Sequence, residues 1–259
     1  MLLVLPPSET KRDGGATGSV LDPAALGFPD LTPHRARALA ALRALSRTVA
    51  ASSASLGLGP TQRFEIDRNR ALTTSPVMPA IDRYTGVLYD GLAADTLSAI
   101  ERAFAYEHTL IASALFGVLR AADPIPAYRL SHDSRLPGMS LRRHWQQPVT
   151  AALAAGHAGH AGHPGSAEQF GLLLDLRSES YVRLGPAPAS SFYLRVVAED
   201  ARGRRLALSH FNKKGKGQFA RAVISAGIDH DTVDSLLQWA AVSGIRLEHG
   251  AAGVLDLVV

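Results

Sequence analysis

A run of lysines and glycines gives the strongest chemical signal in the sequence. It reads Lys213-Lys214-Gly215-Lys216-Gly217 and precedes a predicted helix over 218–226. Glycines let backbone amides approach an anion closely, and the start of a helix adds a partial positive charge. We therefore predict a phosphate-binding loop, for a nucleotide or for a nucleic-acid backbone, with a solvated basic turn as the alternative. The GxxxxGK[ST] spacing of a Walker A loop is absent.

Two arginines are the next candidates for binding an anion. Arg120 and Arg129 lie in the stretch 110–130, which begins as an apolar run and breaks at Gly117. That pattern is typical of a buried strand leading into a loop. Arginine binds phosphate or carboxylate through two parallel hydrogen bonds. Asp123 could orient either arginine, or could form a structural pair that only fixes the loop.

Acid–base chemistry is a second possibility, because a glutamate and a lysine could share a proton-transfer role if they are buried together. There is no cysteine, and no Ser-His-Asp order with recognisable spacing. Tyrosines could pack with a polar tip or stack on a base. The candidate catalytic residues are Ser8, Glu9, Lys11, Asp123, Ser178 and Glu179, and the stacking or packing tyrosines are Tyr89, Tyr128 and Tyr181.

The composition is that of a globular protein. Of 259 residues, 46% are hydrophobic and 19% are charged. The absence of cysteine excludes disulfides, thiolate metal sites and a thiol nucleophile. The start, MLLVLPPSE, is too short and too soon interrupted by proline for a signal peptide, and no apolar run reaches membrane-spanning length. We expect a soluble cytoplasmic protein, whose net charge of +4 tolerates an anionic partner.

The elements that must position these residues are interleaved strands and helices. Ser98 and Glu101 have the spacing of a capping box, which predicts a helix over 99–108. Interleaving of this kind predicts a single mixed α/β domain over 1–259. Strands are predicted at 1–5, 80–88 (ended by a turn at 89–92), 110–116, 170–176 and 253–259, and a hairpin at 192–211 with its turn at 200–203. Helices are predicted at 36–51, at 142–155 with Trp145 as anchor, and after 231.

Two segments rich in arginine or histidine are assigned to the surface. The arginines of the first helix, Arg35, Arg37, Arg43 and Arg47, are assigned to a solvated face rather than to a binding surface. The tract 156–165 reads GHAGHAGHPG, and the glycines between its histidines preorganise nothing. We therefore predict a flexible connector there, no metal site, and no cofactor.

Five stretches, in order along the chain, resemble the YaaA family, also called DUF328 or the peroxide stress protein family. Any one of them would be a weak signal, but all five together span nearly the whole chain. They are PPSETK at 6–11, YDGL at 89–92, GVLR at 117–120 with Asp123 and YRL at 128–130, LRSESY at 176–181, and SHFNKKGKG at 209–217.

This resemblance implies an unusual α/β fold described as cantaloupe-like. It also implies DNA binding through a positively charged groove and a helix-hairpin-helix-like element, and protection against hydrogen peroxide by limiting free iron. Glu9 stands where the family commonly has lysine, and lysine replaces the aliphatic residue in the middle of the GxG turn. The positions that match the family's motifs are Arg120, Asp123, Tyr128, Arg129, Ser178, Tyr181, Lys213, Lys214 and Gly217.

Two functions follow as hypotheses. The first is a stress protein that binds double-stranded DNA, without sequence preference and without catalytic turnover. The second is an enzyme acting on a nucleotide or another phosphorylated small molecule, since a protein that binds only DNA backbone has little need of carboxylates. Convergence of the motif residues in a deep pocket would favour the second hypothesis, and scatter along a shallow basic groove the first. Direct iron binding has weaker support, because no carboxylate–histidine ligand spacing stands out.

Overall fold

The computed structural model describes residues 1–160, 171–199, 205–207 and 210–259. This part of the chain has the mixed α/β fold predicted from the sequence. Eight of its strands form one sheet in the order β4-β3-β1-β6-β7-β10-β9, with β8 paired to β7. The strands are β1 (Leu2–Leu5), β3 (Thr109–Ser113), β4 (Gly117–Arg120), β6 (Leu173–Asp175), β7 (Phe192–Glu199), β8 (Arg205–Ala207), β9 (Leu247–His249) and β10 (Val254–Val258). A separate pair joins β2 (Met78–Pro79) to β5 (Pro124–Ile125).

The centre of the sheet is parallel, and its strand order reverses between β1 and β6. Strands β3, β1, β6, β7 and β10 run in the same direction, whereas β4, β8 and β9 are antiparallel to their neighbours. From β1 the chain continues to β3 and β4 on one side, and then starts the other side with β6. In open α/β sheets, ligands bind at such a switch point, outside the carboxyl ends of the strands.

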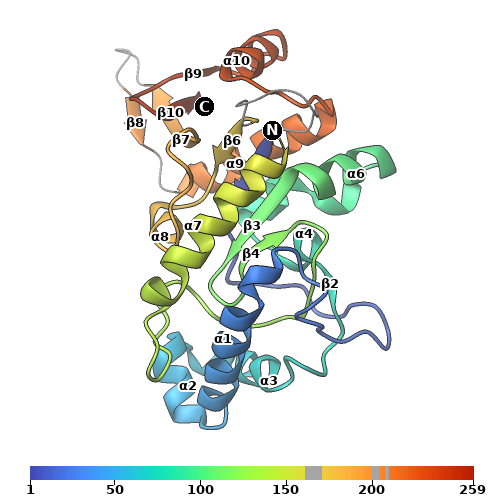
Figure 1. Cartoon of the computed structure of the whole chain (residues 1–259), viewed down its shortest axis with the longest axis vertical. Helices are drawn as coiled ribbons and strands as arrows, with labels where there is room; N and C mark the ends of the chain where they lie inside the picture. The colour runs from blue at the N-terminus through green and yellow to red at the C-terminus, as the bar shows by residue number, and fades with distance from the viewer. Residues whose placement is uncertain (161–170, 200–204, 208–209) are drawn as a thin grey trace.

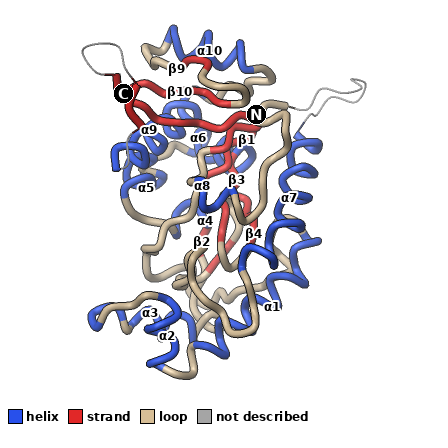
Figure 2. Tube along the Cα trace, turned by 90° about the vertical axis from the view of Figure 1, so that its left-hand side faces the viewer, coloured by secondary structure: helices blue, strands red, loops and turns tan. Residues whose placement is uncertain are grey.

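Helices cover both faces of the sheet. Figures 1 and 2 show α5, α6 and α9 on one face, and α1 and α7 on the other. Helix α6 has the predicted bounds, and both hydrogen bonds of its capping box are present. The helices are α1 (Thr32–Leu45), α2 (Val49–Leu56), α3 (Phe64–Arg70), α4 (Ala80–Arg83), α5 (Val87–Leu92), α6 (Ala99–His108), α7 (Leu141–His160), α8 (Glu179–Val182), α9 (His210–Ala226) and α10 (Val233–Val242).

The core forms one continuous cluster around the central strands. Trp145 anchors α7 in it, as predicted: the side chain is fully buried, and its indole N–H donates to the Ala114 carbonyl at 2.8 Å. Gly117 begins a second, antiparallel strand at the point where a loop was predicted. Its φ of +76° and the Trp145 ring, 2.9 Å from where a Cβ would lie, both require glycine there.

The assignment of Arg35 to a solvated face is wrong. Its guanidinium is buried, and donates from Nε to the Phe116 carbonyl at 3.0 Å and from Nη2 to the Val118 carbonyl at 2.7 Å. Val118 lies in β4 and Phe116 directly before it, and β4 is the last strand on its side of the sheet among the residues described. Arg35 therefore supplies donors that a neighbouring strand would otherwise provide. The other arginines of that face, Arg37, Arg43 and Arg47, are exposed as expected.

The basic glycine segment is not a loop. Helix α9 begins at His210, so residues 213–217 are helical, and the predicted phosphate-binding loop is corrected to a helix. A Cβ on Gly217 would lie 2.0 Å from the carbonyl oxygen of Leu88 in α5. The YDGL stretch, predicted as a strand end and turn, is also helical, and a Cβ on Gly91 would lie 3.0 Å from the Lys214 carbonyl oxygen. The glycines thus let two helix backbones pack closely.

Two predicted connections fall partly outside the described residues. The segment predicted as a connector from 156 is helical as far as His160, at the end of α7, and 161–165 lie outside the described part. The hairpin is confirmed by antiparallel pairing of β7 with β8, while its predicted turn at 200–203 also lies outside.

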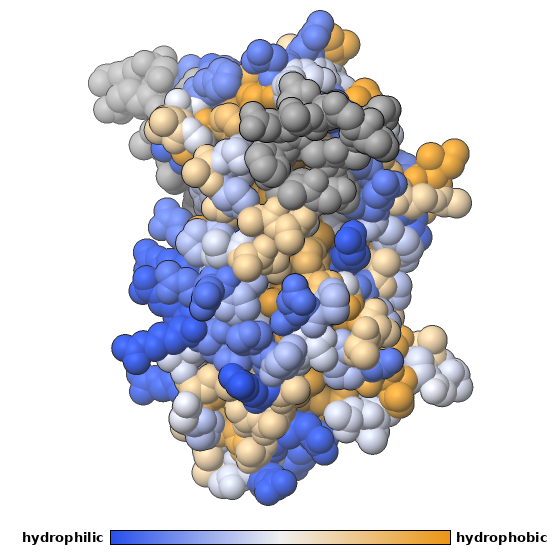
Figure 3. Space-filling view, viewed as in Figure 1, coloured by the Kyte–Doolittle hydropathy of each residue, from blue (hydrophilic) through white to orange (hydrophobic). Residues whose placement is uncertain are grey.

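Polar and apolar side chains are interspersed over the face seen in Figure 3. Large exposed apolar residues come from different elements, for example Ile100 in α6 and Val242 in α10. Among the residues that the structure describes, no helix has the length and apolar character needed to span a membrane.

Candidate functional site

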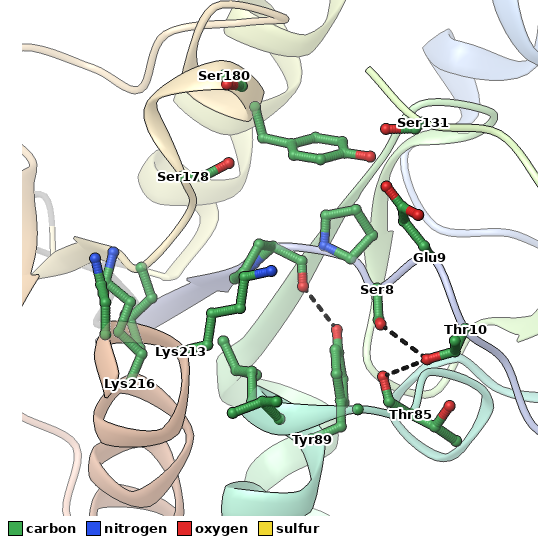
Figure 4. Close-up of a pocket in the computed structure, with 18 of the residues that line it drawn as sticks. Ser8, Glu9, Thr10, Thr85, Tyr89, Ser131, Ser178, Ser180, Lys213 and Lys216 are labelled. Atoms are coloured by element: carbon green, nitrogen blue, oxygen red, sulfur yellow. Dashed lines mark hydrogen bonds between the residues drawn. The ribbon is translucent and has the colours of Figure 1, made fainter. Parts of the chain in front are cut away.

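A pocket of about 580 Å³ lies at the carboxyl ends of β1 and β6, where the strand order reverses. Its size is that of a small-molecule site. Parts of the chain far apart in sequence form its walls (Figure 4): 6–10 after β1, 85–89 at the start of α5, 131–132, 176–181 after β6, and 212–216 in α9. The stretches PPSETK, YDGL, LRSESY and SHFNKKGKG therefore all contribute to one cavity.

The first two turns of α9 form a cationic wall. Lys213 is exposed to solvent and extends into the pocket in Figure 4. Lys216 is only 3% exposed; its ammonium donates to the Arg177 carbonyl at 3.2 Å and lies 4.7 Å from the centre of the Tyr193 ring. Burial lowers the pKa of Lys216 to about 8, although Asp175 and Glu179 oppose that change. An amine with such a pKa can bind an anion and can also exchange a proton close to neutral pH.

Asn212 adds a polar group to the same wall. Its side-chain oxygen is buried and has no hydrogen-bond partner among the described residues. The amide group of asparagine carries both donors and acceptors. Because the first backbone N–H groups of a helix have no partner within it, the start of α9 adds further positive potential. This wall is therefore suited to an anionic group such as phosphate.

Hydroxyl groups line the opposite wall. The Ser8 and Thr10 hydroxyl oxygens are 3.3 Å apart, and the Thr10 hydroxyl donates to the Thr85 carbonyl at 3.2 Å. Gly86 has a φ of +98°, and a Cβ on it would lie 3.2 Å from the Ser8 hydroxyl oxygen. The glycine therefore lets the segment after β1 approach the start of α5.

Two tyrosines complete the walls. The Tyr89 hydroxyl donates to the Pro6 carbonyl at 2.9 Å, which fixes the segment that follows β1. The Tyr181 ring packs edge-on against His132, with 5.2 Å between the ring centres. Burial raises the pKa of Tyr181, and a hydrogen bond with Ser131 opposes that change. Burial also raises the pKa of Tyr89, so both tyrosines remain neutral and line the pocket with their rings.

Lys11 lies behind the hydroxyl wall. It is 5% exposed, and its ammonium donates to the carbonyls of Ser8 at 2.8 Å and Glu9 at 3.0 Å. The ammonium also lies 4.2 Å from the centre of the Tyr128 ring and 5.3 Å from that of Tyr84. Burial lowers the pKa of Lys11 to about 7. Lys11 thus holds the backbone of the pocket segment, although its side chain does not line the pocket.

The structure brings together only part of the residue set predicted from sequence. Those that line the pocket come from segments at strand ends and from α9. They are Ser8, Glu9, Tyr89, Ser178, Tyr181, Lys213 and Lys216. The others lie outside the lining: Lys11, Arg120, Asp123, Tyr128, Arg129, Glu179, Lys214, Gly215 and Gly217.

Arg120 and Asp123 lie away from the pocket, at the end of the sheet where its parallel strands begin. Strand β4 runs antiparallel to β3 and pairs Arg120 with Leu110, near the amino end of β3. The Asp123 carboxylate accepts from the backbone amides of Arg120 at 2.9 Å and Gly27 at 3.0 Å. Asp123 therefore fixes a turn through backbone groups, and the guanidinium of Arg120 stacks instead over Phe28, 5.5 Å from the ring centre.

Several polar lining residues were not predicted from the sequence. Thr10, Ser180 and Asn212 lie within the motif stretches, so the motifs themselves were the available signal. Thr85, Ser131 and His132 lie outside those stretches and have no sequence signal. The buried ion pair of Arg177 with Asp175, with Nη2–Oδ2 at 2.6 Å, was also missed. It fixes the turn that carries Ser178.

Comparison with known proteins identifies the family. A family model described as "Peroxide stress protein YaaA" matches residues 1–248. The chain belongs to the YaaA family. A UPF0246 protein of Corynebacterium efficiens is 40% identical over 266 residues, covering 100% of both chains. Another, from Corynebacterium glutamicum, is 41% identical over 96% of this chain and 95% of its own, and one from Streptomyces coelicolor is 36% identical over 88% and 84%.

The YaaA resemblance predicted from five short stretches is thus confirmed, and the family is one of peroxide stress proteins. Four of those stretches contribute side chains to the pocket. The fifth, at 117–130, contributes buried groups beside it. Tyr128 donates or accepts hydrogen bonds with Ser113 and Tyr84, both at 2.7 Å, at the carboxyl end of β3.

Proposed function

We propose that this YaaA-family protein binds a small phosphorylated molecule in the pocket at the carboxyl ends of β1 and β6. The observation that carries the proposal is the convergence of four motif stretches on one cavity with a cationic wall. Lys213, Lys216 and the start of α9 supply positive potential, and the hydroxyl wall and two tyrosine rings supply hydrogen bonds and apolar surface. A pocket of about 580 Å³ has room for a small molecule, and hydroxyls and a carboxylate on the side away from α9 offer no cations for an extended polyanion.

A double variant tests this proposal. In Lys213→Ala/Lys216→Met, binding of AMP and of inorganic phosphate should weaken at least tenfold, equivalent to about 1.4 kcal/mol, because both amines of the cationic wall are lost. Methionine fills the space of the buried Lys216 side chain. Isothermal titration calorimetry at fixed salt measures the affinities.

Lys214→Ala is the matched control, since Lys214 is exposed on the same helix but does not line the pocket. The affinity of the Lys214→Ala variant for AMP should stay within about twofold of the wild-type affinity. If the double variant binds as tightly as the wild type, or if the control loses as much, the pocket is not the phosphate site.

DNA binding is the second candidate, and the exposed lysines 213 and 214 at the start of α9 favour it. Non-specific binding to duplex DNA should give a slope of log affinity against log salt near −0.9 per phosphate neutralised. Lys214→Ala should then weaken duplex binding and reduce the slope by about one contact, while AMP binding stays unchanged. Fluorescence anisotropy with a labelled duplex at several salt concentrations measures both quantities. An affinity that does not vary with salt argues against this candidate.

A further inference from the structure

The far end of the pocket, away from α9, carries a negative charge held in a fixed direction. Glu9 lines the pocket, and its side chain is 58% exposed. Its Oε2 nevertheless accepts a hydrogen bond from Nη2 of Arg129 at 2.5 Å. Arg129 is 7% exposed, so this partner is anchored in the interior. The carboxylate is therefore accessible to a ligand without being free to turn away.

Arg129 is itself held rigidly. Its backbone amide donates to the Asn69 side-chain oxygen at 2.8 Å, and the Asn69 amide donates back to the Arg129 carbonyl at 2.9 Å. Its Nε is buried and has no hydrogen-bond partner among the residues described. Glu9 therefore presents its exposed carboxylate to the pocket, whereas the guanidinium that pairs with it is buried and lies outside the lining. The identity of residue 9 sets the sign of the charge that a ligand meets there.

The side chains that line the pocket beside Glu9 carry hydroxyls, whereas the two cations that contact Glu9, Arg129 and Lys11, lie outside the lining. Ser8 and Thr10 lie on the same segment, and Figure 4 shows them, with Glu9, on the side of the pocket away from Lys213 and Lys216. Glu9 also lies close enough to Tyr181 to raise the pKa of its hydroxyl, after the larger effect of burial. A carboxylate with hydroxyl neighbours accepts hydrogen bonds from O–H and N–H groups and repels a second anion.

We propose that the pocket selects molecules with one phosphate, placed at the α9 wall, and an uncharged donor-bearing group, hydroxyl or amino, placed at Glu9. Sugar monophosphates and nucleoside monophosphates share this chemistry. Molecules with phosphates at both ends are rejected by Glu9. The inference rests on the proposed function, because it assumes that a phosphate binds at α9. It adds that the other end of the ligand is uncharged and donates hydrogen bonds.

The test compares glucose 6-phosphate with glucose 1,6-bisphosphate, which differ only in the second phosphate, by calorimetry on the full chain. The wild type should bind the monophosphate at least tenfold more tightly. Glu9→Gln should remove most of this preference, and Glu9→Lys should reverse it, because the charge at the far end changes sign. AMP, titrated in parallel, distinguishes a nucleotide from a sugar phosphate by which monophosphate binds more tightly.

Two further variants serve as controls for the effect of the charge at residue 9. Glu107→Gln removes a carboxylate that is 72% exposed and does not line the pocket, so the wild-type preference should remain. Glu9→Gln/Arg129→Gln removes both charges, so that no unpaired guanidinium is left, and should also lose the preference. The inference is overturned if the wild type binds both glucose phosphates equally, or if Glu9→Gln keeps the preference while Lys213→Ala/Lys216→Met loses binding. If no phosphorylated probe binds at all, the proposed function fails as well.

Discussion

Gly217→Ala should lower the free energy of unfolding by about 3 kcal/mol or more. The added methyl carbon would lie 2.0 Å from the Leu88 carbonyl oxygen and 2.9 Å from its carbonyl carbon. These are backbone atoms, so no side-chain rotation can make room, and α5 must move away from α9. Alanine is the better helix former by up to about 1 kcal/mol, which offsets only part of the loss. Urea unfolding followed by circular dichroism measures the change.

Gly215→Ala is the matched control in the same helix. Its added carbon would lie 3.2 Å from a methyl group of Val196, which is a side chain that can shift. The gain in helix propensity should then offset most of the packing cost, leaving a net change within about 1 kcal/mol. Equal stability of Gly217→Ala and the wild type would show that close contact between α5 and α9 is not required for folding.

The glycines of α9 explain why a loop was wrongly predicted at 213–217. Glycine next to lysine is compatible with an anion-binding turn and with close packing of two helices, and only the partner decides between them. That partner, Leu88 in α5, is more than a hundred residues away in the sequence, so no local pattern can reveal it. By contrast, the capping box at Ser98 and Glu101 is entirely local, and it placed the start of α6 correctly.

The same distinction holds for the site. Ser8 and Ser178 each follow a predicted strand, and the parallel pairing of β1 with β6 brings the carboxyl ends of both strands to one side of the pocket. Arg120 also follows an apolar run, but the chain reverses at Gly117, so that Arg120 lies near the amino end of β3, away from the pocket. Strand direction is therefore needed to place a polar residue, and it depends on pairing that composition does not show. The pairing of Glu9 with Arg129 likewise depends on tertiary structure.

Lys11→Met should change how stability depends on pH, by about 4 kcal/mol between pH 6 and pH 10. Burial lowers the pKa of Lys11 from 10.5 to about 7 in the folded protein. Between these values the unfolded chain binds a proton that the folded protein does not, so folding stability rises with pH across this window. Below pH 7 both states are protonated, and the full cost of burying the ammonium is present. Methionine has no charge, so the variant lacks this rise.

The charges around Lys11 oppose one another, so burial remains the dominant cause. Glu65 and Glu9 raise its pKa, whereas Arg129 and Arg68 lower it. Other groups titrate in both proteins, so their contributions cancel when the free energy of unfolding of the variant is subtracted from that of the wild type. Guanidinium unfolding at pH 6, 8 and 10 measures the difference, and Lys214→Met, at an exposed lysine, should show no comparable trend.

The variant should also bind phosphorylated ligands more weakly, even at pH 6, where the loss of a buried charge favours its folding. The Lys11 ammonium donates to the Ser8 and Glu9 carbonyls, and methionine leaves both acceptors without that donor. The segment that presents the hydroxyl and the carboxylate to the pocket then loses its anchor. A charge retained in the interior at a cost in stability is typical of a functional site. If the stability difference between Lys11→Met and the wild type is the same at pH 6 and pH 10, the lysine does not titrate as its burial requires.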